Sequence, residues 1–177
     1  VLNDQIINTS GGFAWANDNK TLFYTNRDSD TLRNDKILRH EIGTKSKDDK
    51  IVFHEKDNTF YTSVSKSKSN KFIIISSHST LTSEFQFLDA NKPSDNFRLF
   101  SQRKRGLEYS INHYEKFFYI ITNIDNAKNY KLMKTPIGGT EYENWINVID
   151  HRKDVLIEGI DIFKNYLVIS ERANGLN

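Results

Sequence analysis

The chain has 177 residues, of which 37% are hydrophobic, 27% charged and 12% aromatic; this composition is typical of a folded globular protein and excludes intrinsic disorder. Eight glycines and two prolines exclude a collagen-like chain, and no apolar run approaches the roughly 18 residues of a membrane helix. The net charge of +2 does not favour nucleic-acid binding, and the lack of cysteine excludes disulfides, cysteine-based zinc sites and a thiol nucleophile.

Short segments rich in β-branched and aromatic residues follow one another along the chain and form a repeated hairpin pattern. The first hairpin joins Phe13–Trp15 to Leu22–Thr25 through the polar turn Asn17–Lys20. Equivalent hairpins follow at Tyr61–Val64 with Phe72–Ser77, Tyr109–Ile111 with Phe117–Thr122, and Ile160–Ile162 with Tyr166–Ser170.

Two further strands follow each of the first three hairpins. Alternating third strands are expected at Lys36–Glu41, Glu84–Leu88 and Asn129–Met133, and short outer strands at Ile51–Phe53, Phe97–Phe100 and Val148–Ile149. Equivalent apolar positions in the four hairpins lie at intervals of 50, 46 and 49 residues: Leu22, Phe72, Phe118 and Leu167. This period is typical of a four-stranded propeller blade and favours blades over a β-sandwich, which also has many short strands.

The sequence therefore predicts an all-β fold, a partial β-propeller with about three complete four-stranded antiparallel blades plus flanking strands. The expected blades span residues 12–56, 59–102 and 107–150. Residues 1–11 would give the outer strand of a preceding blade, at Asp4–Ile7, and residues 157–177 the first hairpin of the next. The side chains expected to be buried between neighbouring blades are Trp15, Phe23, Ile73, Ile75, Phe118, Ile120 and Val168.

Three blades cannot close a ring, because a propeller needs about four to eight. The chain, which begins at Val1, therefore reads as a piece of a longer protein. We expect its edge strands to promote self-association between copies, through residues 1–12 or 157–177.

The sequence contains no recognisable catalytic, cofactor-binding or metal-binding motif. None of its glycines starts a G-x-S-x-G nucleophile elbow, and there is no P-loop, G-x-G-x-x-G or H-E-x-x-H pattern. No two of its histidines are spaced as a local metal pair: they are His40, His54, His78, His113 and His151. We therefore name no catalytic, cofactor-binding or metal-binding residue and expect no cofactor and no activity from the chain itself.

Three basic clusters lie in expected turns: Lys45/Lys47/Lys50, Lys66/Lys68/Lys71 and Arg103/Lys104/Arg105. Nucleic-acid binding requires such charges to be interleaved with exposed aromatic side chains on one surface. The first two clusters are instead mixed with aspartate, serine and asparagine, which is typical of a solvated surface. We expect neither a nucleic-acid partner nor a membrane partner.

Several stretches resemble a known family. The segment Gly12–Tyr24, followed by Thr31–Arg33 and Arg39–Thr44, is similar to the propeller domain of the oligopeptidase B (protease II) group within the prolyl oligopeptidase family of serine peptidases. The similarity continues in order through Phe60–Tyr61, Ser79–Glu84, Arg105–Tyr109, His113–Tyr114, Thr122–Asn123, His151–Glu158 and Glu171–Arg172. It is weakest across Ala90–Asn96 and Gly138–Asn147, where loops are expected.

This resemblance implies a cytoplasmic bacterial peptidase that cleaves short peptides after Lys or Arg. In that family a seven-bladed propeller covers an α/β-hydrolase domain, which carries the catalytic triad and most of the acidic residues that select basic side chains. That domain of the same parent chain and short peptides are the implied partners, and this chain would supply a lid that excludes large folded proteins. The alternative is a scaffold propeller of WD40 or kelch type, although no Trp-Asp dipeptide closes the blades.

Overall fold

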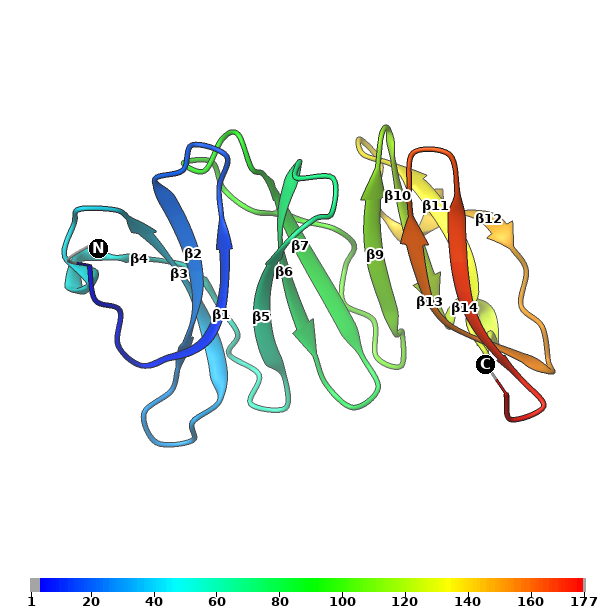
Figure 1. Ribbon diagram of the computed structural model, residues 1–177. Helices are drawn as coiled ribbons and strands as arrows, with labels where there is room; N and C mark the ends of the chain where they lie inside the picture. Colours follow the sequence, from blue (N-terminus) through cyan, green and yellow to red (C-terminus); the bar gives the residue numbers. More distant parts are fainter. Residues whose placement is uncertain (1–3, 177) are drawn as a thin grey trace. The chain divides into compact units, whose positions relative to one another are not determined.

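The computed structural model describes residues 4–176, and these residues form an all-β fold of four antiparallel sheets (Figure 1). They divide into two compact units, which are described separately below. The first comprises residues up to Thr80 together with Glu84–Phe100, and the second comprises Leu81–Ser83 together with the residues from Ser101 onward. Residues 1–3 and 177, parts of the expected segments 1–11 and 157–177, lie outside the described residues.

The first unit contains two four-stranded sheets whose strands pair in chain order. The first sheet consists of β1 (Thr9–Trp15), β2 (Thr21–Arg27), β3 (Asn34–Glu41) and β4 (Lys50–His54). A short 3-10 helix, η1 (Ser46–Asp48), precedes β4. The second sheet consists of β5 (Tyr61–Lys66), β6 (Phe72–His78), β7 (Ser83–Asp89) and β8 (Arg98–Leu99).

The turn between β1 and β2 shows why the polar segment Asn17–Lys20 breaks the strand pattern. The Asp18 carboxylate accepts hydrogen bonds from the backbone N–H of Lys20 (3.0 Å) and of Thr21 (2.9 Å) and from the Thr21 hydroxyl (2.7 Å). Asn19 adopts a left-handed φ of 56°, which asparagine tolerates better than most residues. The aspartate therefore fixes the chain reversal that starts β2.

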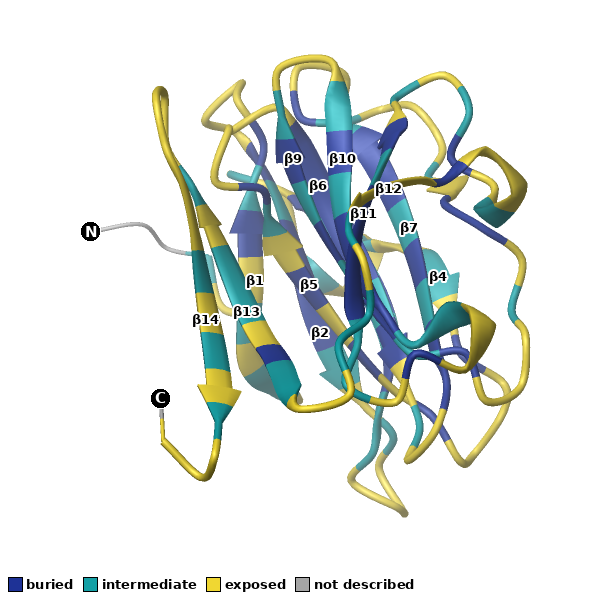
Figure 2. Cartoon of the chain, turned by 90° about the vertical axis from the view of Figure 1, so that its right-hand side faces the viewer, coloured by how far each residue is buried: buried dark blue, intermediate teal, exposed yellow. Residues whose placement is uncertain are grey.

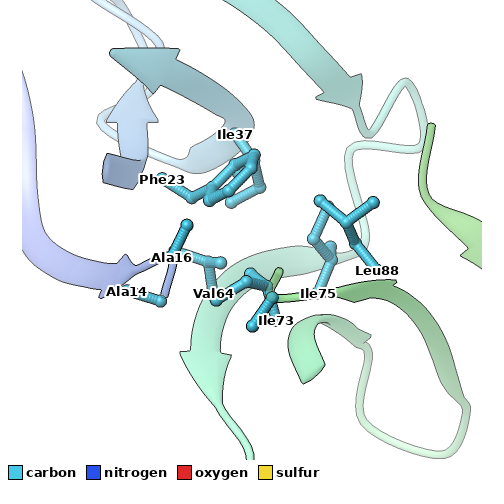
Figure 3. Packing of buried hydrophobic residues seen from close by; sticks show 9 residues of the cluster. Ala14, Ala16, Phe23, Ile37, Val64, Ile73, Ile75 and Leu88 are labelled. Carbon is cyan, nitrogen blue, oxygen red and sulfur yellow. The ribbon is translucent and has the colours of Figure 1, made fainter. Parts of the chain in front are cut away.

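The core of the first unit forms where its two sheets pack face to face (Figure 3). Phe23 and Ile37 of the first sheet are completely buried, and they meet Val64, Ile73 and Ile75 of the second. The backbone N–H of Asn17 also donates to the carbonyl of Ala90 (2.8 Å). Apolar side chains on facing sheets exclude water from this layer, as expected for neighbouring propeller blades.

The second unit contains a four-stranded sheet and a hairpin. The sheet consists of β9 (Tyr109–Tyr114), β10 (Phe117–Thr122), β11 (Lys131–Pro136) and β12 (Ile146–Ile149), with the short 3-10 helices η2 (Ile124–Asn126) and η3 (Tyr142–Asn144) in its connections. The hairpin pairs β13 (Val155–Ile162) with β14 (Leu167–Ala173). Its inner face packs Ile157, Ile160 and Ile169 against the sheet, around buried Ile121 and Leu132.

The burial of individual side chains agrees with most of the expected core. Phe23, Ile73, Ile75, Phe118 and Ile120 are each no more than 1% exposed. Trp15 is only partly buried, and the prediction for Val168 is wrong, because its side chain is 50% exposed. From Val168 onward, exposed residues of β14 alternate with half-buried ones that face the sheet (Figure 2). The burial pattern of the strand places Val168 among the exposed residues.

Several expected strands differ from the structure only in their end residues, such as Phe97–Phe100, of which Arg98–Leu99 forms β8. Two other strand predictions differ for a local structural reason. The expected strand at Asp4–Ile7 is irregular, and its first residue instead accepts a hydrogen bond from the backbone N–H of Gly43 (2.7 Å). The expected strand at Asn129–Met133 begins only at Lys131, because Tyr130 has a left-handed φ of 58° and lies in a turn. In the described part of the chain, no helix has the length and apolar character needed to cross a membrane.

A side chain before the third strand holds the following linker in two of the sheets. Before β3, the Arg33 guanidinium donates to the backbone carbonyls of Glu55 (3.2 Å), Asp57 (3.1 Å) and Phe60 (2.8 Å), which lie between β4 and β5. Before β11, the Asn129 side-chain amide donates to the carbonyls of Arg152 (3.2 Å) and Lys153 (2.8 Å). These bonds fix the course of the chain from one sheet to the next.

Candidate functional site

The buried histidine of the first unit lies in a polar network rather than beside a nucleophile. His40 on β3 places Nδ1 2.8 Å from an Asp49 carboxylate oxygen and Nε2 3.3 Å from an Asp4 carboxylate oxygen. The Tyr24 hydroxyl donates to the other Asp49 oxygen (2.9 Å). Burial and the neighbouring Asp49 raise the pKa of Tyr24, so that it remains a donor. Both imidazole nitrogens therefore face carboxylates, and neither faces a hydroxyl that it could activate.

Three other histidines, His54, His78 and His113, have separate surroundings. His54 Nε2 lies 3.3 Å from an Asp35 carboxylate oxygen. His78 and His113 lie edge-on to the rings of Phe85 and Phe118, with ring centroids 5.3 and 5.1 Å apart, and burial lowers the pKa of His78. Within residues 4–176, no group of three histidine, aspartate or glutamate side chains is placed to hold a metal ion.

The three basic clusters lie on separate turns and linkers. Lys45, Lys47 and Lys50 surround η1. In the β5–β6 hairpin, Lys71 Nζ lies 5.6 Å from the centroid of the Phe72 ring. In the segment before β9, Lys104 Nζ lies 5.5 Å from the centroid of the Tyr142 ring. The aromatic partners of these two lysines are already in contact with them, and Phe72 is buried.

Pockets within each unit have different linings, as three of them show. One of about 250 Å³ in the first unit lies beside Arg39, Lys50 and Phe97. Another of about 490 Å³ in the second unit is formed entirely by the loops Lys104–Leu107 and Asn123–Asn126. The third, of about 370 Å³, we call the Glu108 pocket, and its lining comprises Ser83, Glu108, Tyr109, Ser110, Ile121, Tyr130, Leu156, Ile157 and Glu158.

The Glu108 pocket combines apolar walls with a firmly held carboxylate. Residues from β10 and β13, including Ile121 and Ile157, supply the walls. The Glu108 carboxylate accepts hydrogen bonds from the Tyr130 hydroxyl (3.1 Å) and from the Asn123 side-chain amide (3.4 Å). Burial and the negative charge of Glu108 raise the pKa of Tyr130, which keeps its hydroxyl protonated.

The backbone of Glu108 is fixed by the last residue of β10 and the residue after it. Its N–H donates to the Asn123 side-chain oxygen (2.9 Å), and its carbonyl accepts from the Thr122 hydroxyl (3.1 Å) and the Asn123 N–H (3.1 Å). Sequence reasoning named neither Glu108 nor Glu158 as a site residue. Both nevertheless lie in stretches that carry the family resemblance, Arg105–Tyr109 and His151–Glu158, which was the available signal.

Comparison with known proteins agrees with this architecture. Residues 1–177 match the family described as prolyl oligopeptidase, N-terminal β-propeller domain. Dipeptidyl aminopeptidase BI of Pseudoxanthomonas mexicana is 35% identical, and the match covers 99% of this chain and 24% of that enzyme's length. Protease 2 of Moraxella lacunata is 32% identical, and the match covers 99% of this chain and 25% of that enzyme's length. The structure of oligopeptidase B from Leishmania major superimposes with a TM-score of 0.91 at 30% identity, over 99% of this chain and 24% of that one.

The chain thus spans about a quarter of the length of the relatives that it matches. The match covers the whole sequence, and the observed four-stranded antiparallel sheets confirm the predicted fold class. The chain belongs to the prolyl oligopeptidase family of serine peptidases, as part of its N-terminal β-propeller domain.

Proposed function

We propose that this chain is a non-catalytic part of the propeller of a serine endopeptidase that cleaves short peptides after Lys or Arg. The observation that carries the proposal is the match along the whole chain to the propeller domain of the family, together with the similarity to oligopeptidase B and protease 2. A scaffold propeller of WD40 or kelch type is not favoured, because this family match covers residues 1–177.

In this proposal the propeller acts as a lid over an α/β-hydrolase domain of the same parent chain. Closely packed sheets, such as those joined by Phe23 and Ile73, form a rigid wall that a folded protein cannot pass. The wall selects substrates by size and excludes water, while the hydrolase domain supplies the nucleophile. We place the parent enzyme in the cytoplasm, as the resemblance to oligopeptidase B implies.

A second candidate is a peptidase that releases dipeptides from the free amino end of a substrate. It is favoured by the 35% identity to an enzyme named dipeptidyl aminopeptidase BI. Such an enzyme must recognise the terminal ammonium group, whereas an endopeptidase accepts a blocked amino end. The two candidates therefore differ in one measurable requirement.

The complete gene product that carries residues 1–177 tests the proposal. We expect it to hydrolyse N-acetylated short peptides after Arg or Lys, to leave the same peptides with Leu at that position intact, and to lose activity with a serine-directed inhibitor. A folded protein with exposed arginines should remain uncut. Cleavage only of peptides with a free amino end would favour the second candidate, and rapid cleavage of folded proteins would contradict the lid.

A further inference from the structure

We propose that the Glu108 pocket is a binding site for a positively charged group of a peptide, an ammonium or a guanidinium. This inference rests on the proposed function only in taking peptides as the ligands. It adds to that function a cation subsite on the propeller itself.

Glu108 brings a negative charge into the pocket. This half-buried carboxylate receives two hydrogen bonds, from Tyr130 and Asn123, but no ion pair with a cation among residues 4–176. Glu158 in the same pocket is different, because it pairs with Arg172. A carboxylate that is partly removed from water and lacks a cationic partner gains most from a positive ligand.

The Glu108 carboxylate keeps free acceptor sites and is already held in position. Tyr130 and Asn123 occupy one site on each oxygen, and a carboxylate has about four acceptor sites in total. The three backbone contacts of Glu108 with Thr122 and Asn123 hold the residue in place before any ligand arrives. A cation therefore meets a preorganised acceptor and pays little ordering entropy.

The walls of the pocket define the rest of the ligand. Ile121 and Ile157 are buried beside it, and Leu156 is half-buried. A volume of about 370 Å³ accommodates one amino-acid side chain or one terminal residue rather than a folded element. An apolar stem that ends in a cation, as in Lys, Arg or an amino-terminal residue, matches both the walls and the carboxylate.

The position of the pocket in the fold makes it reachable by a peptide. Its lining includes the first residues of β9 and the start of β13, which are the first strands of their sheets. First strands are the expected inner strands of propeller blades, and blades surround a central channel. We therefore infer that a peptide in the channel of the closed propeller could reach the pocket.

The test is a binding titration of the 177-residue chain, followed by NMR, with three small probes: N-acetyl-arginine amide, alanyl-alanine amide with a free amino end, and neutral N-acetyl-alanyl-alanine amide. We expect at least one cationic probe to bind and the neutral probe to bind at least tenfold more weakly. Binding of the acetylated arginine probe identifies a side chain as the ligand, and binding of the free-amine probe identifies the amino end.

Glu108→Gln should weaken binding of the cationic probe by about tenfold, the effect of losing one charge interaction of about 1.4 kcal/mol. The matched control is Glu143→Gln, an exposed glutamate on η3 outside the pocket lining, which should leave the affinity unchanged. Leu156→Arg is a second variant that places a guanidinium in the pocket wall, and it should also abolish binding.

Equal affinity of wild type and a folded Glu108→Gln chain would overturn the proposal, as would equal binding of the neutral probe or no binding at millimolar concentration. If Glu108→Gln fails to fold, unchanged binding by Leu156→Arg has the same consequence. A complete gene product without peptidase activity would refute the proposed function instead, since this titration measures binding and not hydrolysis.

Discussion

The guanidinium of Arg33 donates a 2.8 Å hydrogen bond to the backbone carbonyl of Phe60, 27 residues further along the chain. The same side chain reaches the carbonyls of Glu55 and Asp57. One charged group thus satisfies three acceptors in the linker between the first two sheets. Arginine suits this position because its planar fork presents several N–H groups in fixed directions.

Arg33→Ala should lower the free energy of unfolding by about 2–4 kcal/mol, because three carbonyls lose a charged donor. Arg33→Lys should recover only part of this loss, since an ammonium cannot span all three acceptors. Urea denaturation measures the effect. The exposed Arg27→Ala at the end of β2 serves as control and should change stability by less than about 0.5 kcal/mol. Equal effects of the two alanine variants would contradict the role of Arg33.

Packing between the first two sheets predicts a contrast between two apolar positions. Phe23→Ala should cost about 3–5 kcal/mol, because Phe23 is fully buried and its ring contacts that of Phe97 edge-on. Val168→Ala should cost less than about 1 kcal/mol, because that side chain is half exposed on β14. Thermal and urea unfolding of the two variants measure this. A larger loss for Val168→Ala would contradict the observed packing.

Most strands could be predicted from local sequence, whereas the linkers and the pocket could not. The apolar run Phe117–Thr122 is β10 without change of bounds. Strand β11 starts later than expected because Tyr130 has a left-handed φ and ends a turn. In this position the Tyr130 hydroxyl donates to the carboxylate of Glu108, 22 residues earlier in the chain. The burial of Val168 was wrongly expected, because alternation along a strand does not show whether anything covers the outer face.

Neither the Glu108 pocket nor the contacts of Arg33 could be predicted from local sequence. Glu108 depends on Asn123 and Tyr130, which are distant in sequence, and the acceptors of Arg33 are backbone carbonyls. Backbone acceptors leave no trace in the identity of their residues. Such contacts follow from the sheet pairing and become visible only in the folded chain.

The turn at Asp18 predicts an acid-dependent loss of stability. Although burial opposes ionisation, hydrogen bonds from Lys20 and Thr21 outweigh it and hold the pKa of Asp18 below its usual value. A lowered folded-state pKa means that the stabilising contribution is present above the unfolded value of about 3.9 and is lost as pH falls through the folded value. Asp18→Asn should therefore be less stable than wild type at neutral pH, and the difference should shrink below about pH 4.

Urea midpoints of wild type and Asp18→Asn across this pH range measure the effect. Asp154→Asn, at an exposed position before β13, serves as control for the loss of a carboxylate and should leave the urea midpoint at neutral pH nearly unchanged. A gap between wild type and Asp18→Asn that widens as the pH falls would contradict the assigned direction.

The exposed face of β14 predicts self-association of the isolated chain. Tyr166, which directly precedes β14, and Val168 on its exposed side are 73% and 50% exposed, and burying such side chains against a second copy favours dimers. Val168→Asp should shift the chain toward monomer. Sedimentation velocity at increasing concentration measures this, with Ser94→Asp, at an exposed position in the β7–β8 connection, as control for added charge. A wild-type chain that remains monomeric at high concentration would show that this face does not associate.

The central claim is that this chain is the non-catalytic propeller part of a serine peptidase. Its most direct test is the hydrolysis of short fluorogenic peptides that end in Arg or Lys, measured with the purified 177-residue chain beside the complete gene product. We expect the complete product to turn over these peptides and to be blocked by a serine-directed inhibitor, while the chain alone shows no turnover above buffer. Inhibitor-sensitive turnover that co-elutes with the 177-residue chain would contradict the account.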